Sequence, residues 1–392
     1  MTAAYEAFLA ARVHSAGRAI RRSTLRHTFL ARKPFGLALF RLGGERFRAA
    51  AVAWGDLSGN YKLAVTGDPR NRDLYFAALL PFAKDLCKQV RRAMQSTEEL
   101  QRGSQEIVVP KNPPQIIVPN KATVSAVALL GRYLAYLSDK GGVRPDPALI
   151  EAGKYLRIYA NSFRVPGQSL IVPVDTLLND HWATLLSPVE QSNLAAVAAQ
   201  VWPPKNTHCY LASIAAEKEM TIGPEPTEQV DRAVAPLLET FNRQRAGSTS
   251  SDTVARLIGP LRRHYDSLLK PVWRLMRRAV ASEKKLPAAP STLRRWAEDR
   301  VAVARHFEHV LRGGRLSTRD TPRQAAAVLR AWEDSLRRYE AEKATEDPAC
   351  MIPYLLEGTA ILGKVVEIEI NKVRPRVRRA TIRVEEIGRA HV

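Results

Sequence analysis

The strongest hydrophobic pattern in this chain lies between Asp252 and Lys285. Its apolar residues recur at intervals of three and four positions, the spacing that places side chains along one face of an α-helix. About 28 residues would span roughly 42 Å, enough to cross a nucleic-acid duplex. We therefore predict one long amphipathic helix here. The residues of its apolar face are Val254, Leu257, Ile258, Leu261, Tyr265, Leu268, Leu269, Val272 and Met276.

The first hundred residues combine helical spacing with short apolar runs, which predicts a small α+β unit. Gly43 and Gly44 separate two of these runs, as in a β-hairpin. In chain order, we expect a helix over residues 3–31, strands over Phe35–Phe40, Phe47–Trp54 and Tyr61–Val65, and a helix over Asp73–Met94.

The middle of the chain is predicted to be mostly helical. Ile107–Val109 and Ile116–Val118 flank a proline loop, and we expect them to form an edge hairpin, because proline cannot donate a ladder hydrogen bond. Ser169–Val174 predicts a further strand. Helices are expected over residues 120–137, 147–161, 187–201, 210–220 and 227–244, and residues 246–251 have the composition of a linker.

Two helices and a change to β structure follow the long basic helix. Ser291 is expected to cap a helix over residues 292–311, and Thr321 with Gln324 forms a capping box for the next. With the basic helix they would make a set of three antiparallel helices, and strands over Gly358–Ile370 and Ala380–Glu385 would follow. The apolar face of the last helix contains Ala325, Val328, Leu329, Trp332, Leu336 and Tyr339.

These elements predict a mainly α protein with minor β structure (α+β). Residues 387–392, Ile-Gly-Arg-Ala-His-Val, match what one reading frame of a common sequencing-adapter oligonucleotide would encode, so we expect a non-native tail and a natural frame that continues. The expected divisions are a small α+β unit with a basic N-terminal helix (1–110), a helical domain with one or two short strands (115–245), a basic helical bundle (252–348), a partial β domain (351–386) and the tail (387–392).

Charge changes this picture more than any motif does. The 392 residues include 60 Lys and Arg against 39 Asp and Glu, a net charge of +21, which favours an anionic partner such as nucleic acid. A GC-rich genome would also enrich Arg, but here the basic residues are clustered. Arg side chains make forked contacts to phosphate. The predicted nucleic-acid-binding residues are Arg18, Arg21, Arg22, Arg26, Arg262, Arg263, Lys270, Arg274, Arg277, Arg278, Arg376, Arg378 and Arg379.

Arg18, Arg22 and Arg26 would share one face of the first helix at intervals of four. A mitochondrial presequence is an alternative for this acid-poor segment, although Glu6 interrupts it. No apolar run approaches the length of about 18 residues that a membrane span needs. Three distant cysteines without a CxxC motif fit a reducing compartment, so we expect a cytoplasmic bacterial protein.

Few residues suggest chemistry. His306 and His309 lie three positions apart on a predicted helix, with Asp299 one heptad before His306, so they are weak metal-ligand candidates. His208 and Cys209 are adjacent, which does not by itself bring a Cys–His pair together. Asp175 follows the interior strand and Asp180-His181 come shortly after it, where helix capping is the expected role of Asp175.

The chain has no GxxxxGK[ST], GxGxxG or GxSxG motif, so we expect no nucleotide-phosphate cradle and no cofactor. The leading hypothesis is a non-enzymatic accessory protein that binds nucleic-acid backbone with weak sequence specificity. It would act beside a separate helicase or nuclease in DNA or RNA processing. Two alternatives are a scaffold that binds an acidic protein partner, and a hydrolase or metal-dependent enzyme of unknown substrate.

Overall fold

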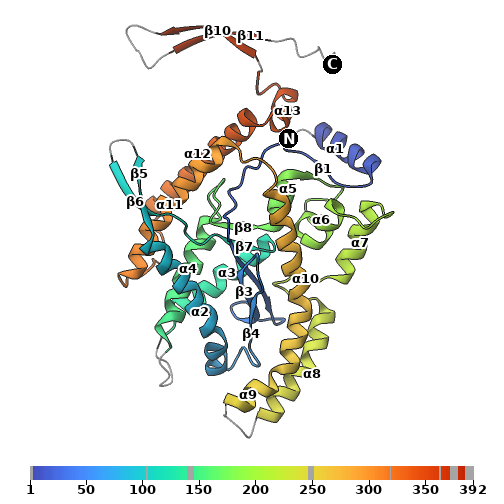
Figure 1. Cartoon of the computed structure of the whole chain (residues 1–392), viewed down its shortest axis with the longest axis vertical. Helices are drawn as coiled ribbons and strands as arrows, with labels where there is room; N and C mark the ends of the chain where they lie inside the picture. The colour runs from blue at the N-terminus through green and yellow to red at the C-terminus, as the bar shows by residue number, and fades with distance from the viewer. Residues whose placement is uncertain are drawn as a thin grey trace.

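The computed structural model describes residues 3–102, 105–138, 145–245, 251–317, 319–361, 363–370 and 378–384. Helices dominate these residues (Figure 1), which confirms the predicted mainly α protein with minor β structure. The helices are α1 (Ala3–Ala16), α2 (Arg72–Gln95), α3 (Lys121–Ala135), α4 (Pro147–Ser162), α5 (Val174–His181), η1 (Glu190–Ser192), α6 (Leu194–Val201), α7 (Cys209–Glu219), α8 (Glu228–Arg245), α9 (Ser251–Leu257), α10 (Gly259–Glu283), α11 (Pro290–Leu311), α12 (Pro322–Glu346) and α13 (Pro348–Leu356).

A mixed five-stranded sheet lies at the centre of the molecule, in the order β4-β3-β2-β7-β8. β2, β3 and β4 form an antiparallel meander, and β7 and β8 add to β2 in parallel. The strands are β1 (Ile20–Arg21), β2 (Phe35–Arg41), β3 (Ala49–Asp56), β4 (Lys62–Val65), β5 (Thr97–Arg102), β6 (Gln105–Pro110), β7 (Ile116–Val118), β8 (Ile171–Pro173), β9 (Trp182–Ala183), β10 (Gly363–Ile370) and β11 (Arg378–Val384).

The sheet confirms one predicted hairpin and corrects another. β2 and β3 pair across the Gly43-Gly44 turn, with Leu39 opposite Val52. β6 pairs with β5 instead of with Ile116–Val118. All three residues of β7 are buried, and this strand is central because it lies between β2 and β8. A short apolar run of this kind fits a parallel strand that is covered on both faces.

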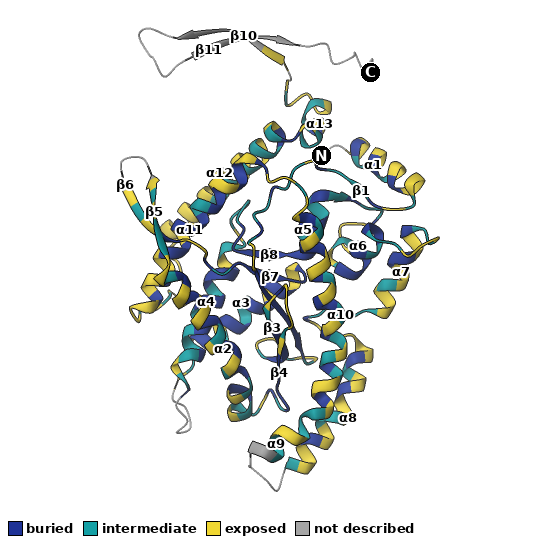
Figure 2. Ribbon diagram, viewed as in Figure 1, coloured by how far each residue is buried: buried dark blue, intermediate teal, exposed yellow. Residues whose placement is uncertain are grey.

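Helices cover both faces of the sheet (Figure 1). Leu37 and Leu39 point to the layer made of α2, α3, α4 and α11. Ala38 and Phe40, the alternate residues of the same strand, point to α5, α6, α8 and α10. β2 is therefore buried at every position. This burial on two faces explains why its sequence is continuously apolar. Figure 2 shows the central part of the sheet, around β3 and β7, in the dark colour of buried residues.

The first three expected divisions share these two cores. The sheet joins strands from residues 1–110 to strands from 115–245, while α10 and α11 supply buried residues to opposite faces of it. A boundary near residue 110 or 250 therefore does not separate independent hydrophobic cores. The expected partial β domain corresponds to α13 followed by the β10–β11 hairpin. The tail, 387–392, lies outside the described residues.

The predicted helix over residues 3–31 was too long. α1 ends at Ala16, and Gly17 has φ +62°, a left-handed conformation that favours glycine at a helix end. The following segment is extended and includes the short strand β1. Arg18, Arg22 and Arg26 therefore do not share a helical face. Arg18 is exposed, whereas the other two are partly buried.

The long basic helix is divided in two. α9 ends at Leu257 and α10 begins at Gly259, with Pro260 in its first turn. Proline is tolerated there because the first helical N–H groups have no partner within the helix. α10 alone has 25 residues, or about 37 Å at the standard helical rise.

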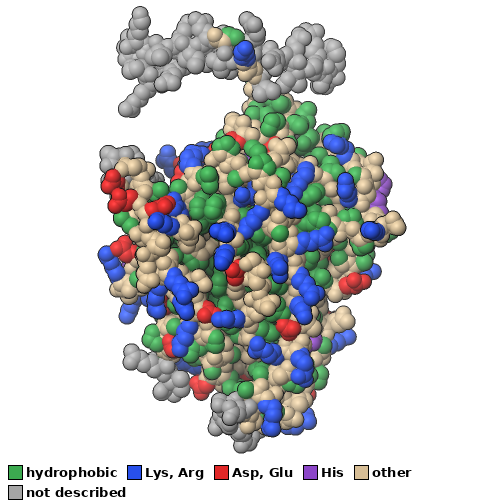
Figure 3. Space-filling view, in the orientation of Figure 1, with side chains coloured by type: hydrophobic (Ala, Val, Ile, Leu, Met, Phe, Trp, Pro, Cys, Tyr) green, Lys and Arg blue, Asp and Glu red, His purple; other side chains and the backbone are tan. Residues whose placement is uncertain are grey.

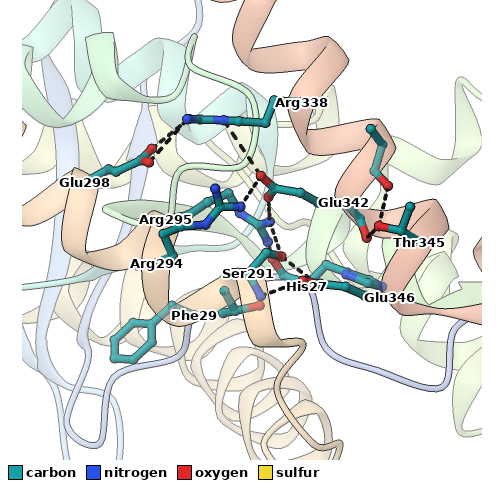
Figure 4. A network of polar contacts seen from close by, with 12 residues as sticks. His27, Phe29, Ser291, Arg294, Arg295, Glu298, Arg338, Glu342, Thr345 and Glu346 are labelled. Atoms are coloured by element: carbon teal, nitrogen blue, oxygen red, sulfur yellow. Dashed lines mark hydrogen bonds and ion pairs between the residues drawn. The ribbon is translucent and has the colours of Figure 1, made fainter. Parts of the chain in front are cut away.

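α12 does not bury the apolar face that its sequence predicts. Residues 321–331 are exposed throughout, and Leu329 retains 55% of its accessible surface. Ion pairs connect its C-terminal half to α11. In Figure 4, Arg295 reaches Glu342 and Arg338 reaches Glu298. The predicted capping box of Thr321 and Gln324 is confirmed.

Residues 19–31 form a partly buried connection between α1 and the sheet, which we call the N-terminal strap. Gln115, on the loop before β7, is 1% exposed and satisfies three groups beside it. Its Oε1 accepts from the Ala31 N–H at 2.8 Å, and its Nε2 donates to the carbonyls of Phe29 at 2.7 Å and Ser169 at 2.6 Å. A buried irregular segment needs such partners because its backbone has none of its own.

Replacing Gln115 by Leu should therefore destabilise the fold. Three buried backbone groups would lose their partner, and each unsatisfied group costs about 1–3 kcal/mol. We expect the free energy of unfolding, measured by urea denaturation, to fall by roughly 3 kcal/mol or more.

Gln101→Leu is the matched control, because Gln101 is exposed and, among the described residues, its side-chain amide donates only to Glu106 on the neighbouring strand. It should change stability by less than about 0.5 kcal/mol. Equal effects of the two substitutions would contradict the role of Gln115.

Candidate nucleic-acid interface

α10 is held against the sheet by its apolar face. Tyr265, Leu269 and Trp273 are all buried, and Gly36 of β2 allows the close approach, since a Cβ there would lie 2.4 Å from the Trp273 ring. Tyr265, which lies on the predicted apolar face, is therefore in the core, and so is Trp273. This packing fixes which side of α10 faces solvent. In Figure 3, Lys and Arg side chains recur in the region of α10 and outnumber acidic ones on this face.

The six predicted binding residues of α10 lie on its solvent-exposed side. At about 100° per residue they fall within an arc of roughly 160°. In the described part of the chain, no ion pair is formed by Arg262, Arg263, Lys270, Arg274, Arg277 or Arg278. Arg278 stacks on Trp202, with its guanidinium 4.6 Å from the ring centroid. The guanidinium and ammonium groups on this side are thus free to meet an external anion.

The tertiary structure adds residues to this surface that the motif search missed. Lys284 follows α10 and donates to the Arg32 carbonyl at 3.2 Å, which places exposed Arg32 and Lys33 beside the helix end. Burial pushes the pKa of Asp56 up, but hydrogen bonds from Ser58 and the nearby Lys33 and Lys284 bring it below its usual value. We call the six α10 residues together with Arg32, Lys33, Lys284 and Lys285 the α10 basic surface.

A groove continues from this surface. It has a volume of about 480 Å³ and is lined by Arg32, Lys33, Asp56, Gln89 and residues 112–114. The only sequence signal for Arg32 and Lys33 was the absence of acidic residues between Ala7 and Gly44. Their position beside α10 could not be read from the chain, because about 250 residues separate the two segments.

The N-terminal arginines that were predicted to bind nucleic acid mostly have internal partners. Arg21 pairs with buried Glu283 at 2.6 Å and stacks on Trp182. Arg22 pairs with Glu6 at 2.7 Å. Arg26 donates to the Thr28 carbonyl, and burial lowers its pKa. Of the four predicted here, only Arg18 remains as an exposed cation.

Two of the three C-terminal arginines that were predicted to bind nucleic acid lie in the described part of the chain. Arg378 and Arg379 lie on β11, opposite Ile370 and Glu369. Arg376 is outside the described residues.

The structure does not assemble the predicted metal ligands. Asp299, His306 and His309 all lie on α11, but they form no group within ligand distance. The His309 Nε2 lies 3.0 Å from the Arg315 carbonyl, to which its N–H can donate. Asp299 is buried and accepts from the Ser169 N–H at 2.7 Å. Burial raises the pKa of Asp299 to about 7, although this hydrogen bond opposes the shift.

The other polar candidates have structural partners. Asp175 is buried in the first turn of α5 and accepts from the N–H groups of Thr176 and Lys121. It is not the N-cap of the following helix that the sequence predicts, because Pro173 holds that position and makes no side-chain cap hydrogen bond. Burial raises the pKa of Asp175 to about 6. His208 caps α7 through the Tyr210 N–H. The His181 Nδ1 lies 2.7 Å from the Leu177 carbonyl, and its Nε2 accepts from the His27 N–H.

The structure also brings together three residues that the sequence search did not group. His27, Asp347 and Cys350 place one potential metal-ligand atom each within 4.8 Å of the others. No spacing motif could reveal them, since about 320 residues lie between His27 and the other two.

Comparison with protein-family models, curated proteins and solved structures found no match to this chain. Among the described residues, none of the helices combines the length and the apolar character needed to cross a membrane. The arguments about function therefore rest on the geometry and charge of the chain itself.

The buried carboxyl of Asp299 gives a prediction for stability against pH. Its ordinary pKa is about 3.9, and its folded-state pKa is about 7. The folded protein therefore binds more protons than the unfolded chain between these values, so this contribution is full below pH 4 and is lost as the pH rises to 7. We expect the free energy of unfolding of wild type, relative to Asp299→Asn, to fall over this range.

Urea denaturation at a series of pH values would measure this difference. Asp334→Asn on exposed α12 is the control and should shift all points equally. Parallel pH profiles for wild type and Asp299→Asn would contradict the assignment.

Proposed function

We propose that this chain binds the phosphate backbone of a nucleic acid through the α10 basic surface. The observation that supports this most is that the six cations of α10 lie on one exposed side without carboxylate partners. From Arg262 to its end at Glu283, the helix extends about 32 Å. A duplex presents a phosphate charge about every 1.7 Å along its axis, so several contacts can form at once.

The aromatic residues favour backbone binding over base reading. Tyr265, Trp273 and Trp296 are buried in the two cores, so they offer no face on which a base could stack. Arginine contacts to phosphate position a protein without carrying sequence information. We therefore propose weak sequence specificity and strong dependence on salt.

The protein would act as an accessory to a separate helicase or nuclease in the bacterial cytoplasm. This part of the proposal rests on the clustering of charge without a nucleotide-phosphate motif in the sequence. Positive potential along α10 would also speed the encounter with a nucleic acid.

An acidic protein partner is the second candidate, and the exposed side of α12 favours it. Val328, Leu329 and Leu336 are exposed on one helix, and apolar residues of this kind mark protein contacts more often than nucleic-acid contacts. Competition with polyglutamate distinguishes the two candidates. Polyglutamate should displace a bound acidic protein from the chain. If the partner is instead a nucleic acid, a duplex of equal charge should compete far better than polyglutamate.

A salt series tests the proposed binding directly. Affinity for a random-sequence duplex should fall steeply as salt rises, because each phosphate contact adds about 0.9 to the slope of log affinity against log salt. Fluorescence anisotropy with duplex and single-stranded probes would measure it. A flat salt dependence would contradict backbone binding.

Charge reversal of Arg262, Arg263, Arg274 and Arg277 to Glu should abolish binding. The substituted residues are exposed, so each should change stability by about 0.5 kcal/mol or less, and circular dichroism would check the fold. The matched control reverses four other exposed arginines, Arg305, Arg315, Arg323 and Arg330, and changes the net charge equally. Equal loss of binding in both variants would mean that total charge, not the α10 basic surface, determines affinity.

A further inference from the structure

His27 is a buried imidazole without ordinary hydrogen bonds at its ring. It is 1% exposed, and its Nδ1 has no partner among the residues that the structure describes. Its Nε2 lies 3.5 Å from Asp347 Oδ2 and 3.8 Å from Cys350 Sγ. An imidazole nitrogen, a carboxylate oxygen and a thiol sulfur are thus gathered at one place, with each of the three atoms within 4.8 Å of the others. These are donor types that divalent transition metals take.

We propose that His27, Asp347 and Cys350 bind a zinc-type divalent transition-metal ion. Ligand atoms at about 2.0–2.3 Å from a tetrahedral metal lie roughly 3.3–3.6 Å apart. The observed separations, 3.5 and 3.8 Å, are close to these values. Small side-chain movements would therefore complete the site.

The set of donors selects the class of metal. A thiolate with an imidazole nitrogen suits zinc or cobalt, whereas magnesium and calcium take oxygen ligands. Three protein ligands leave a fourth position of a tetrahedral ion. Cys350 also lines a cavity of about 290 Å³ with Tyr5, Lys343 and Tyr354. This cavity supplies an entry path and room for a water or a small ligand at the fourth position.

The surrounding structure holds the ligands in place. Asp347 caps α13 and Cys350 lies in the first turn of that helix, so both ligands come from one rigid unit. The Asp347 carboxylate accepts from Ser23 Oγ at 2.7 Å, from the Thr24 N–H at 2.8 Å and from Thr24 Oγ1 at 2.9 Å. Outer hydrogen bonds of this kind orient the carboxylates that bind metals.

Cobalt substitution tests the site in the full-length chain. Purified protein incubated with Co²⁺ should show thiolate-to-cobalt charge-transfer absorption in the near ultraviolet, and elemental analysis after dialysis with zinc should find about one equivalent per chain. Cys350→Ala should lose the absorption band. Cys209→Ala should keep it, because Cys209 is buried on α7, away from this group. A wild-type protein without the band, or a band that persists in Cys350→Ala, would overturn the proposal.

A second variant leaves all three ligands in place. Thr24→Val removes the hydroxyl that donates to Asp347 and should weaken zinc affinity by about 10- to 100-fold. Competition with a chelating dye would measure this change. An unchanged affinity would show that Asp347 is not a ligand, even if the variant lost stability.

Discussion

The burial of the N-terminal strap is the constraint on which the rest of this structure depends. An irregular segment in a protein interior must find a partner for each backbone N–H and carbonyl outside itself. Asp347 accepts from the N–H groups of Thr24 and Leu25, and Arg295 donates to the His27 carbonyl at 2.6 Å. Figure 4 shows how Arg295 in turn contacts Ser291 and Glu342. The strap thereby joins α11, α12 and α13 to the body that contains the sheet.

The positively charged residues of the chain fall into two groups, those with carboxylate partners inside the fold and those on the exposed side of α10. Arg21, Arg22 and Arg295 have carboxylate partners and contribute to the fold. In the described part of the chain, the six cations of α10 form no ion pair, because the helix buries its apolar side against β2 and β4 and leaves these residues exposed on the other. A net charge of +21 alone does not reveal this division. It is the geometry that makes an external anion the natural partner of α10.

Short-range patterns predicted most elements well. The two glycines before β3, the capping box at Thr321 and the apolar spacing of α2 depend on residues that are close in the chain. The predictions failed where contacts with residues far apart in the sequence outweighed the local helical pattern. Residues 17–31 have helical spacing, but hydrogen bonds with distant elements, among them α5, α6, β9 and α11, stabilise an extended strap. The apolar side of α12 has the right period, yet nothing in the described residues covers its first half.

The sequence by itself determined the mainly α character, the position of most helices and the exposed basic side of α10, because helical period and charge are local properties. Only the tertiary structure decided which arginines are free, which strands meet in the sheet, and that His27 lies beside Asp347 and Cys350. Those outcomes depend on contacts between segments hundreds of residues apart, where packing and hydrogen-bond satisfaction outweigh local preference.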